Sequence, residues 1–251
     1  MRLPVPALTV AALAMLLLLA GCADEGPGSP STATAAPSSV PPTALTPTAP
    51  PAPTTPTAPA AAPPEATTSA LGEVDPPTPP DLADRLRSGG LVVVHRYTGA
   101  FVPDRPDAAP EGLIDDRQRI TDESTRAMQR LGRAYERIGV RVGTVLASEY
   151  YFVVQHARAA FGDRVRTDRD LTGSLYFDDQ DELAASLQGL RNRVVAPPAP
   201  GQTTVLFTHQ GKFEKAFGYY LDAGRTLVFE PDGSGAPRLV ANLSLEDFLA
   251  L

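Results

Sequence analysis

Residues 23–80 are dominated by proline, threonine, alanine and serine, and this segment limits where the chain can fold. It holds 17 of the 27 prolines and no lysine or arginine. Such a composition buries too little apolar surface to offset the chain entropy lost on folding, so we predict a disordered tether. The globular part is therefore expected over residues 81–251, which is long enough for one domain with a real core.

The N-terminus has the features of a signal sequence. Arg2 is followed by a run without charge that ends in Leu19-Ala20-Gly21-Cys22. A short apolar run that ends at small residues is typical of a cleaved signal over residues 1–22 rather than of a spanning helix. The four residues resemble the lipobox of bacterial lipoproteins, which implies that Cys22 is lipidated. We therefore expect an extracytoplasmic protein anchored to the membrane by its N-terminal lipid; the alternative is a plain secretory signal.

Charge and cysteine content exclude several classes of function. Residues 81–251 carry 24 acidic and 21 basic side chains and have no basic tract, so we expect no nucleic-acid partner. A single cysteine excludes an intrachain disulfide framework and a cysteine-based zinc site. His95, His156 and His209 are enough imidazoles for a zinc ion, but nothing in their spacing supports such a site. We expect no metal and no cofactor, and the sequence names no protein partner.

The pattern of the domain alternates between strands and helices. Short β-branched apolar runs are typical of strands buried on both faces, and apolar residues at helical spacing separate them. This alternation predicts an α/β fold, a mostly parallel sheet with helices on both faces. We expect helices over 81–87, 121–138, 150–161, 179–190 and 213–221, and strands over 91–94, 143–147, 203–208, 226–229 and 238–241. Polar residues that follow such strands mark the place where these folds bind ligands; three segments qualify, beginning at His95, Ser148 and His209.

Those three segments resemble the histidine phosphatase superfamily, which includes the phosphoglycerate mutases. The first is His95-Arg96-Tyr97, where the family has Arg-His-Gly or Arg-His-Ala, and the last is Thr208-His209-Gln210, where it has Thr-His-Gly or Thr-His-Gln. Gln118 to Arg126 and Val228 to Gly233 are also similar to family blocks. The resemblance implies a histidine-phosphatase-like fold and a site for a phosphorylated or other anionic ligand. In the family a neutral imidazole attacks phosphorus while arginines hold the phosphoryl oxygens.

The sequence departs from the family where the chemistry takes place. One alignment keeps Arg96 as the phosphate-binding arginine and puts Tyr97 at the nucleophile position; a shift of two residues puts His95 there instead. Phe152 stands in place of the family's second phosphate-binding arginine, and Val154 replaces another. Arg119 is a candidate phosphate ligand or a partner of charges near the helix start. No acid is selected by spacing among Glu149, Asp178 and Asp179.

The sequence leaves two hypotheses for function. The first is a membrane-anchored lipoprotein whose histidine-phosphatase-like domain is degenerate and acts by binding an anion or as a scaffold. The alternative is an active extracytoplasmic phosphomonoesterase that uses His95 or Tyr97 with Arg96 and His209. A two-lobed solute-binding protein has little room in a single domain of this length.

Overall fold

The computed structural model describes residues 70–251. The predicted signal sequence, Cys22 and residues 23–69 of the predicted tether lie outside the described residues. The helices are α1 (Leu82–Ser88), α2 (Asp122–Ile138), α3 (Tyr151–Phe161), α4 (Gln180–Val195), α5 (Gln210–Phe217) and α6 (Leu245–Ala250). The strands are β1 (Val92–Arg96), β2 (Ala100–Phe101), β3 (Arg119–Ile120), β4 (Val142–Ala147), β5 (Val165–Thr167), β6 (Thr203–Thr208), β7 (Thr226–Phe229) and β8 (Leu239–Leu243).

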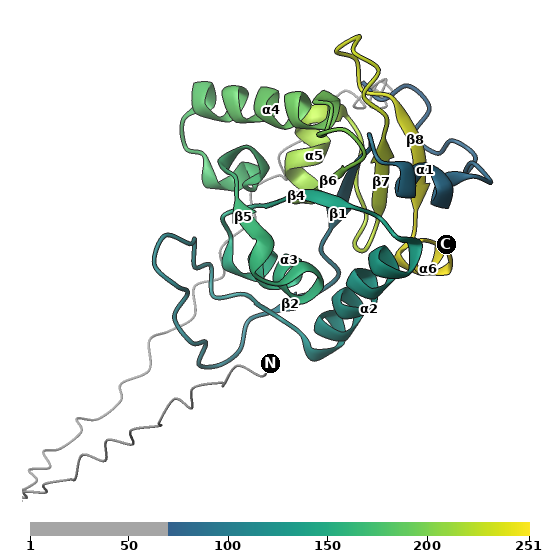
Figure 1. Cartoon of the computed structure of the whole chain (residues 1–251). Helices are drawn as coiled ribbons and strands as arrows, with labels where there is room; N and C mark the ends of the chain where they lie inside the picture. The colour runs from purple at the N-terminus through teal and green to yellow at the C-terminus, as the bar shows by residue number, and fades with distance from the viewer. Residues whose placement is uncertain (1–69) are drawn as a thin grey trace, which may run out of the picture. The chain divides into compact units, whose positions relative to one another are not determined.

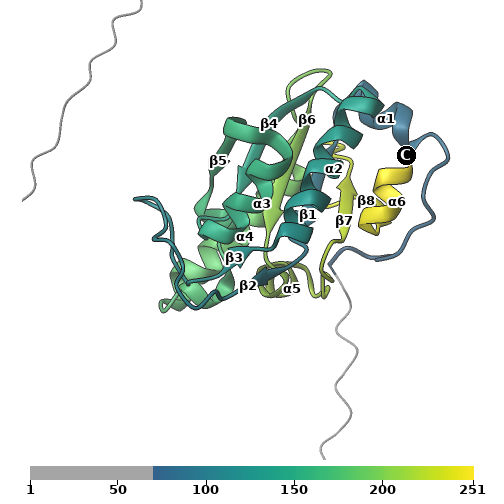
Figure 2. The same cartoon turned by 90° about the horizontal axis from the view of Figure 1, so that it is seen from below.

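Six strands form one sheet in the order β5-β4-β6-β1-β7-β8, which can be followed across Figure 2. β1, β4, β5 and β6 are parallel, and β7 runs antiparallel to both of its neighbours. The predicted α/β class with a mostly parallel sheet is therefore confirmed. β2 and β3 form a separate two-stranded ribbon in the loop region after β1.

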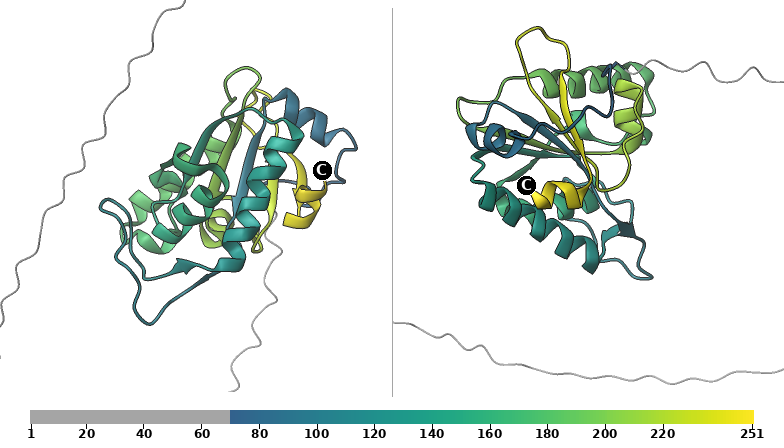
Figure 3. Two further views of the ribbon diagram at one scale, coloured as in Figure 1. Left: turned by 60° about the horizontal axis from the view of Figure 1, so that its bottom comes forward. Right: turned by 90° about the vertical axis from the view of Figure 1, so that its right-hand side faces the viewer.

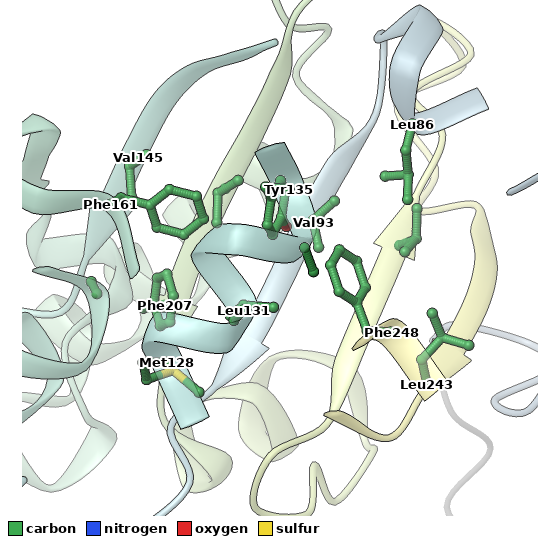
Figure 4. Packing of buried hydrophobic residues seen from close by; sticks show 14 of the residues in the cluster. Leu86, Val93, Met128, Leu131, Tyr135, Val145, Phe161, Phe207, Leu243 and Phe248 are labelled. Carbon is green, nitrogen blue, oxygen red and sulfur yellow. The ribbon is translucent and has the colours of Figure 1, made fainter. Parts of the chain in front are cut away.

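Helices cover both faces of the sheet, as the sequence predicts (Figure 1). Alternate residues of β1 show why, because Val93 points into one core while Val92 and Val94 point into the other. The first core packs the sheet against α1, α2, α3 and α6, and Figure 4 shows part of it around Tyr135 and Phe248. The second core packs the opposite face against α4 and α5. α1 and α6 lie beside α2 in the views of Figure 3.

Most predicted elements are close to the observed ones. The best-defined helix begins at Asp122, and the Thr121 side chain caps it by accepting a hydrogen bond from the Ser124 N–H at 3.0 Å. The helix expected over 213–221 instead spans Gln210–Phe217, because it begins directly after the strand end at His209 and stops at Gly218 in the left-handed conformation. The helix expected to end at residue 190 continues to Val195.

The folded part begins earlier than residue 81. Leu71 is buried in the second core, Val74 packs at its edge, and the Ala70 N–H donates to the Phe217 carbonyl at 2.9 Å. The Asn242 side chain donates to the Val74 carbonyl at 2.8 Å. The boundary at 81 is therefore wrong by about ten residues. Leu71 and Val74 are surrounded in the sequence by proline and acidic residues, so no apolar pattern indicates that they pack in the core.

Candidate functional site

The carboxyl ends of β1, β4 and β6 meet at one edge of the sheet, where a cavity of about 340 Å³ opens. Open α/β sheets bind ligands at this edge. The residues that line the cavity come from the end of β1, the loops that follow β1, β4 and β5, the start of α3, and the junction of β6 and α5: Arg96, Tyr97, Asp116, Gln118, Tyr150, Phe152, Gly173, Ser174, Leu175, His209, Gln210, Gly211 and Lys212. Arg96, Tyr97 and His209 of the predicted site are thus brought together.

Arg96 presents an uncompensated positive charge to this cavity. It is the last residue of β1, and its backbone N–H donates to the Arg225 carbonyl at 3.0 Å. Its Nε is buried without a hydrogen-bond partner, and no acidic side chain in residues 70–251 forms an ion pair with its guanidinium. The guanidinium lies 5.3 Å from the centre of the Tyr97 ring. A buried donor without a partner is costly in a folded protein, so this group is suited to an incoming acceptor.

His209 lies between β6 and α5, and the Ser148 hydroxyl holds its ring. The distance from His209 Nε2 to Ser148 Oγ is 2.7 Å, and the Tyr150 N–H donates to the same hydroxyl at 3.2 Å. Burial, together with the charges of Arg96 and Lys212, lowers the pKa of His209 to about 3. The imidazole is therefore neutral at neutral pH. Its Nε2 is occupied by a buried hydroxyl.

An aromatic wall surrounds this histidine. The ring centres of Tyr150, Tyr97 and Phe152 lie 5.0, 5.7 and 5.7 Å from that of His209. Phe152 packs edge-on against Tyr97 at 4.9 Å and is only 1% exposed. Val154, the other residue at a family arginine position, is buried in the first core and does not line the cavity. An apolar ring thus stands where the family resemblance calls for a second cation.

The first turn of α5 adds hydrogen-bond donors to the cavity. The first backbone bond of this helix runs from the Phe213 N–H to the His209 carbonyl, so the N–H groups of Gln210, Gly211 and Lys212 have no acceptor within the helix. These residues line the cavity, where the positive end of the helix dipole favours an anion.

Lys212 itself directs its charge away from the cavity. Its ammonium group hydrogen-bonds to the Ser186 hydroxyl of α4 and lies 4.5 Å from the centre of the Phe177 ring. The side chain is fully buried, and burial lowers the pKa of Lys212 to about 8.

His95, the alternative nucleophile, lies in the first core and not at the cavity. Its Nδ1 is 2.8 Å from Thr226 Oγ1, its Nε2 is 2.8 Å from the Tyr135 hydroxyl, and the residue is 2% exposed. Burial lowers its pKa to about 3. The assignment of His95 as a nucleophile is therefore wrong. The alternation of β1 turns its side chain toward α2, and both ring nitrogens are used there.

Arg119 is also misplaced as a phosphate ligand. Its guanidinium forms an ion pair with Asp115 at 3.0 Å, bonds to the carbonyls of Asp107 and Gln118, and lies 4.9 Å from the Tyr151 ring centre. It does not line the cavity. Asp115, four positions before it in the chain, pairs with its charge locally, and Arg119 orders the loop before β3.

The acidic residue at the cavity is one that the sequence did not single out. Asp116 lines it, and its two carboxylate oxygens accept from the N–H of Gln118 at 3.1 Å and from Gln118 Nε2 at 2.6 Å. Glu149 accepts instead from the Thr172 hydroxyl, and Asp179 caps α4. Asp178 is exposed and lies outside the cavity lining. Asp116 and Lys212 carry no sequence pattern that would have identified them, whereas Ser148 begins one of the three polar segments expected at strand ends.

Within residues 70–251, no group of histidine, cysteine and acidic side chains is arranged to hold a metal ion. His156 is buried on α3, where its Nδ1 donates to the Phe152 carbonyl at 2.7 Å. A search of the same part of the chain finds no helix with the length and hydropathy needed to cross a bilayer.

Comparisons with known proteins find similar solved structures only. No family model and no curated protein matches the chain. The protein histidine phosphatase SixA, solved with tungstate, is 16% identical, with a TM-score of 0.43 over 62% of this chain and 97% of that one. α-Ribazole phosphatase from Shigella flexneri is 14% identical (TM-score 0.39; 62% and 96%), and phosphoglycerate mutase from Plasmodium falciparum is 10% identical (TM-score 0.36; 59% and 87%). These are histidine phosphatases and phosphoglycerate mutase-like proteins, the superfamily that the sequence resembles.

Proposed function

We propose that this domain binds a small anion in the cavity at the end of β1 and does not hydrolyse phosphomonoesters. The observation that carries the proposal is the Arg96 guanidinium, which faces the cavity without a partner beside the donors of the α5 N-terminus. A planar fork of donors next to backbone N–H groups is a strong anion site.

The same cavity lacks what covalent phosphoryl transfer needs. His95 is enclosed in the core, and His209 Nε2 is held by the Ser148 hydroxyl. Phe152 stands where the family resemblance calls for a second arginine, so a single arginine would face the charge that spreads over three phosphoryl oxygens. Positioning and charge stabilisation supply nearly all of the catalysis in such reactions, and here both are reduced.

The test is hydrolysis of an aryl phosphate by the full chain between about pH 5 and 8, the range in which an ordinary imidazole titrates. Tyr97→Phe and His209→Ala variants serve as controls. We expect the three proteins to show the same background rate, and the wild type to bind inorganic anions that Arg96→Gln does not. Turnover by the wild type that disappears in Tyr97→Phe would establish the alternative, a phosphomonoesterase with a tyrosine nucleophile.

We further propose that the chain is a lipoprotein held at the extracytoplasmic face of a membrane through Cys22. The supporting observation is the Leu19-Ala20-Gly21-Cys22 sequence after an uncharged apolar run. Several acyl chains give firm anchoring, because each buried CH₂ adds about 0.8 kcal/mol. The Cys22→Ala variant should leave the membrane fraction and lose the lipid mass of the N-terminal peptide. Recovery of both proteins in the soluble fraction would contradict the anchor.

A further inference from the structure

The net charge that the cavity offers to a ligand is small. Arg96 is the one cation among residues 70–251 whose charged group faces it without a partner, since the Lys212 ammonium is directed to Ser186 on α4. His209 is neutral there, and the Asp116 carboxylate lines the same cavity. The α5 N-terminus adds about half a positive charge.

A phosphomonoester does not match this balance. A phosphate monoester carries about −1.5 to −2 charge at pH 7. One guanidinium and one carboxylate in the same cavity, with a helix terminus, leave part of that charge uncompensated in a partly buried site, which is costly. A ligand with a single negative charge fits better.

Part of the remaining lining is aromatic or aliphatic, and it includes Tyr97, whose ring centre lies 5.3 Å from the Arg96 guanidinium. Tyr97, Tyr150 and Phe152 form an aromatic surface around His209. Leu175 stands at the rim of the same cavity with 93% of its surface exposed. An exposed leucine next to an aromatic wall is suited to covering the apolar body of a ligand whose charged end lies at Arg96.

From this arrangement we infer that the cavity selects an organic carboxylate with an aromatic or aliphatic body over a phosphomonoester. A carboxylate has one charge and two oxygens that match the guanidinium fork. The apolar body lies against Tyr97 and Tyr150 and reaches Leu175, while Phe152, which is only 1% exposed, packs against the Tyr97 ring. The inference rests on the proposed function, because it names the class of anion that the same site takes.

The experiment is a calorimetric titration of the full chain at pH 7 with four probes: 3-phenylpropionate, acetate, phenyl phosphate and inorganic phosphate. We expect 3-phenylpropionate to bind at least tenfold more tightly than acetate. We also expect it to bind at least tenfold more tightly than phenyl phosphate. Arg96→Gln should weaken 3-phenylpropionate at least tenfold. Arg126→Gln, which removes an exposed arginine of α2 outside the cavity, should leave its affinity unchanged.

Leu175→Ser tests the apolar part separately. Because the side chain is almost fully exposed, the fold does not depend on it. The variant should weaken 3-phenylpropionate several-fold and leave acetate as in the wild type.

The outcomes separate the two proposals. Binding of none of the four probes would overturn both the anion site and the inference. Phosphate or phenyl phosphate that binds as tightly as 3-phenylpropionate, or more tightly, would keep the anion site and overturn the inference. Equal affinity for acetate and 3-phenylpropionate would overturn the role of the aromatic wall.

Discussion

At the scale of single residues, the three histidines in residues 70–251 differ in what surrounds their rings. His95 and His156 use ring nitrogens inside the first core, while His209 turns its ring toward the cavity. Burial lowers the pKa of each, to about 3 for His95 and His209 and about 4 for His156. All three are therefore neutral in the folded state near neutral pH.

These pKa values predict destabilisation by mild acid. In the unfolded chain a histidine takes up its proton near pH 6.5, whereas in the folded state the buried ring takes it up only near pH 3 to 4. Below pH 6.5 the unfolded state therefore binds more protons, and the free energy of unfolding falls as the pH is lowered. Each fully linked histidine contributes about 1.4 kcal/mol per pH unit in this window.

The His95→Gln variant isolates one of these contributions. Glutamine can still bond to Thr226 and Tyr135, but it does not titrate. Urea unfolding between pH 6 and 4.5 gives the free energy of unfolding at each pH. The slope of this free energy against pH should be about 1.4 kcal/mol per pH unit smaller in the variant than in the wild type. Anion affinity should be unchanged, since His95 lies outside the cavity. Equal slopes in the two proteins would mean that His95 is not the buried neutral ring described above.

Sequence reasoning placed Arg96, Tyr97 and His209 at the strand ends, because a buried run followed by polar residues marks that edge of the sheet. It could not decide between Tyr97 and His95, because both lie on the same face of β1 and the choice depends on how far along the chain the strand stays inside the core. The segment beginning at Ser148 was expected at this edge too, but its bond to His209 spans 61 positions, which no local pattern encodes. Asp116 reaches the site through loop geometry.

At the scale of elements, α2 and α3 approach each other closely at a glycine. A Cβ on Gly132 would lie 2.2 Å from the Ala160 carbonyl oxygen, so the crossing of these helices requires a residue without a side chain. Both helices were predicted well, because their apolar residues repeat at helical spacing. The need for glycine at position 132 depends on a contact between the two and was not predictable. β5, α6 and the β2–β3 ribbon were missed because they are too short to show a period.

The Gly132→Ala variant should be less stable despite the better helix propensity of alanine. Propensity alone favours alanine by about 1 kcal/mol, but forcing the helices apart costs more, and we expect a net loss of about 2 kcal/mol. The measurement is the urea concentration at the midpoint of unfolding. A shift of this midpoint reports stability when the dependence of the unfolding free energy on urea concentration is the same in both proteins.

Gly189→Ala on α4 is the matched control. Its Cβ would meet the side chain of Asp170, which can rotate away, whereas the Ala160 carbonyl is fixed in a helix backbone. The control should therefore lose much less stability. A Gly132→Ala protein as stable as the wild type would show that α2 and α3 can separate without cost.

At the scale of the whole molecule, the globular part of the chain includes residues before α1. Leu71 fills a place in the second core, and backbone contacts at Ala70 and Val74 hold the segment across α5 and β8. The α/β class could be predicted from the alternation of buried apolar runs. The start of the domain at residues 70–74 could not, because its apolar side chains are too few to form a pattern.

A chain that begins at residue 81 should be less stable than one that begins at residue 70. Loss of the buried Leu71 side chain costs about 2 kcal/mol, the lower end for a core leucine, since it lies at the border of the core. Urea unfolding of both chains measures the difference, and Leu71→Ala in the longer chain should reproduce most of it. Leu175→Ser, at the exposed leucine, should change stability by less than about 0.5 kcal/mol. Identical midpoints for the two lengths would contradict a structural role for residues 70–80.

The way in which residues 70–74 join the domain also determines how it responds to mechanical load. A pull applied through the chain before residue 70 reaches the Ala70–Phe217 hydrogen bond and the Leu71 side chain before it reaches any strand of the sheet. The contacts of this short segment, which include the Asn242–Val74 hydrogen bond, yield at lower force than the ladders that hold β1 between β6 and β7. The segment is therefore a release point: tension would extend the chain by about ten residues, up to the start of α1, while the sheet and the cavity at its edge stay folded.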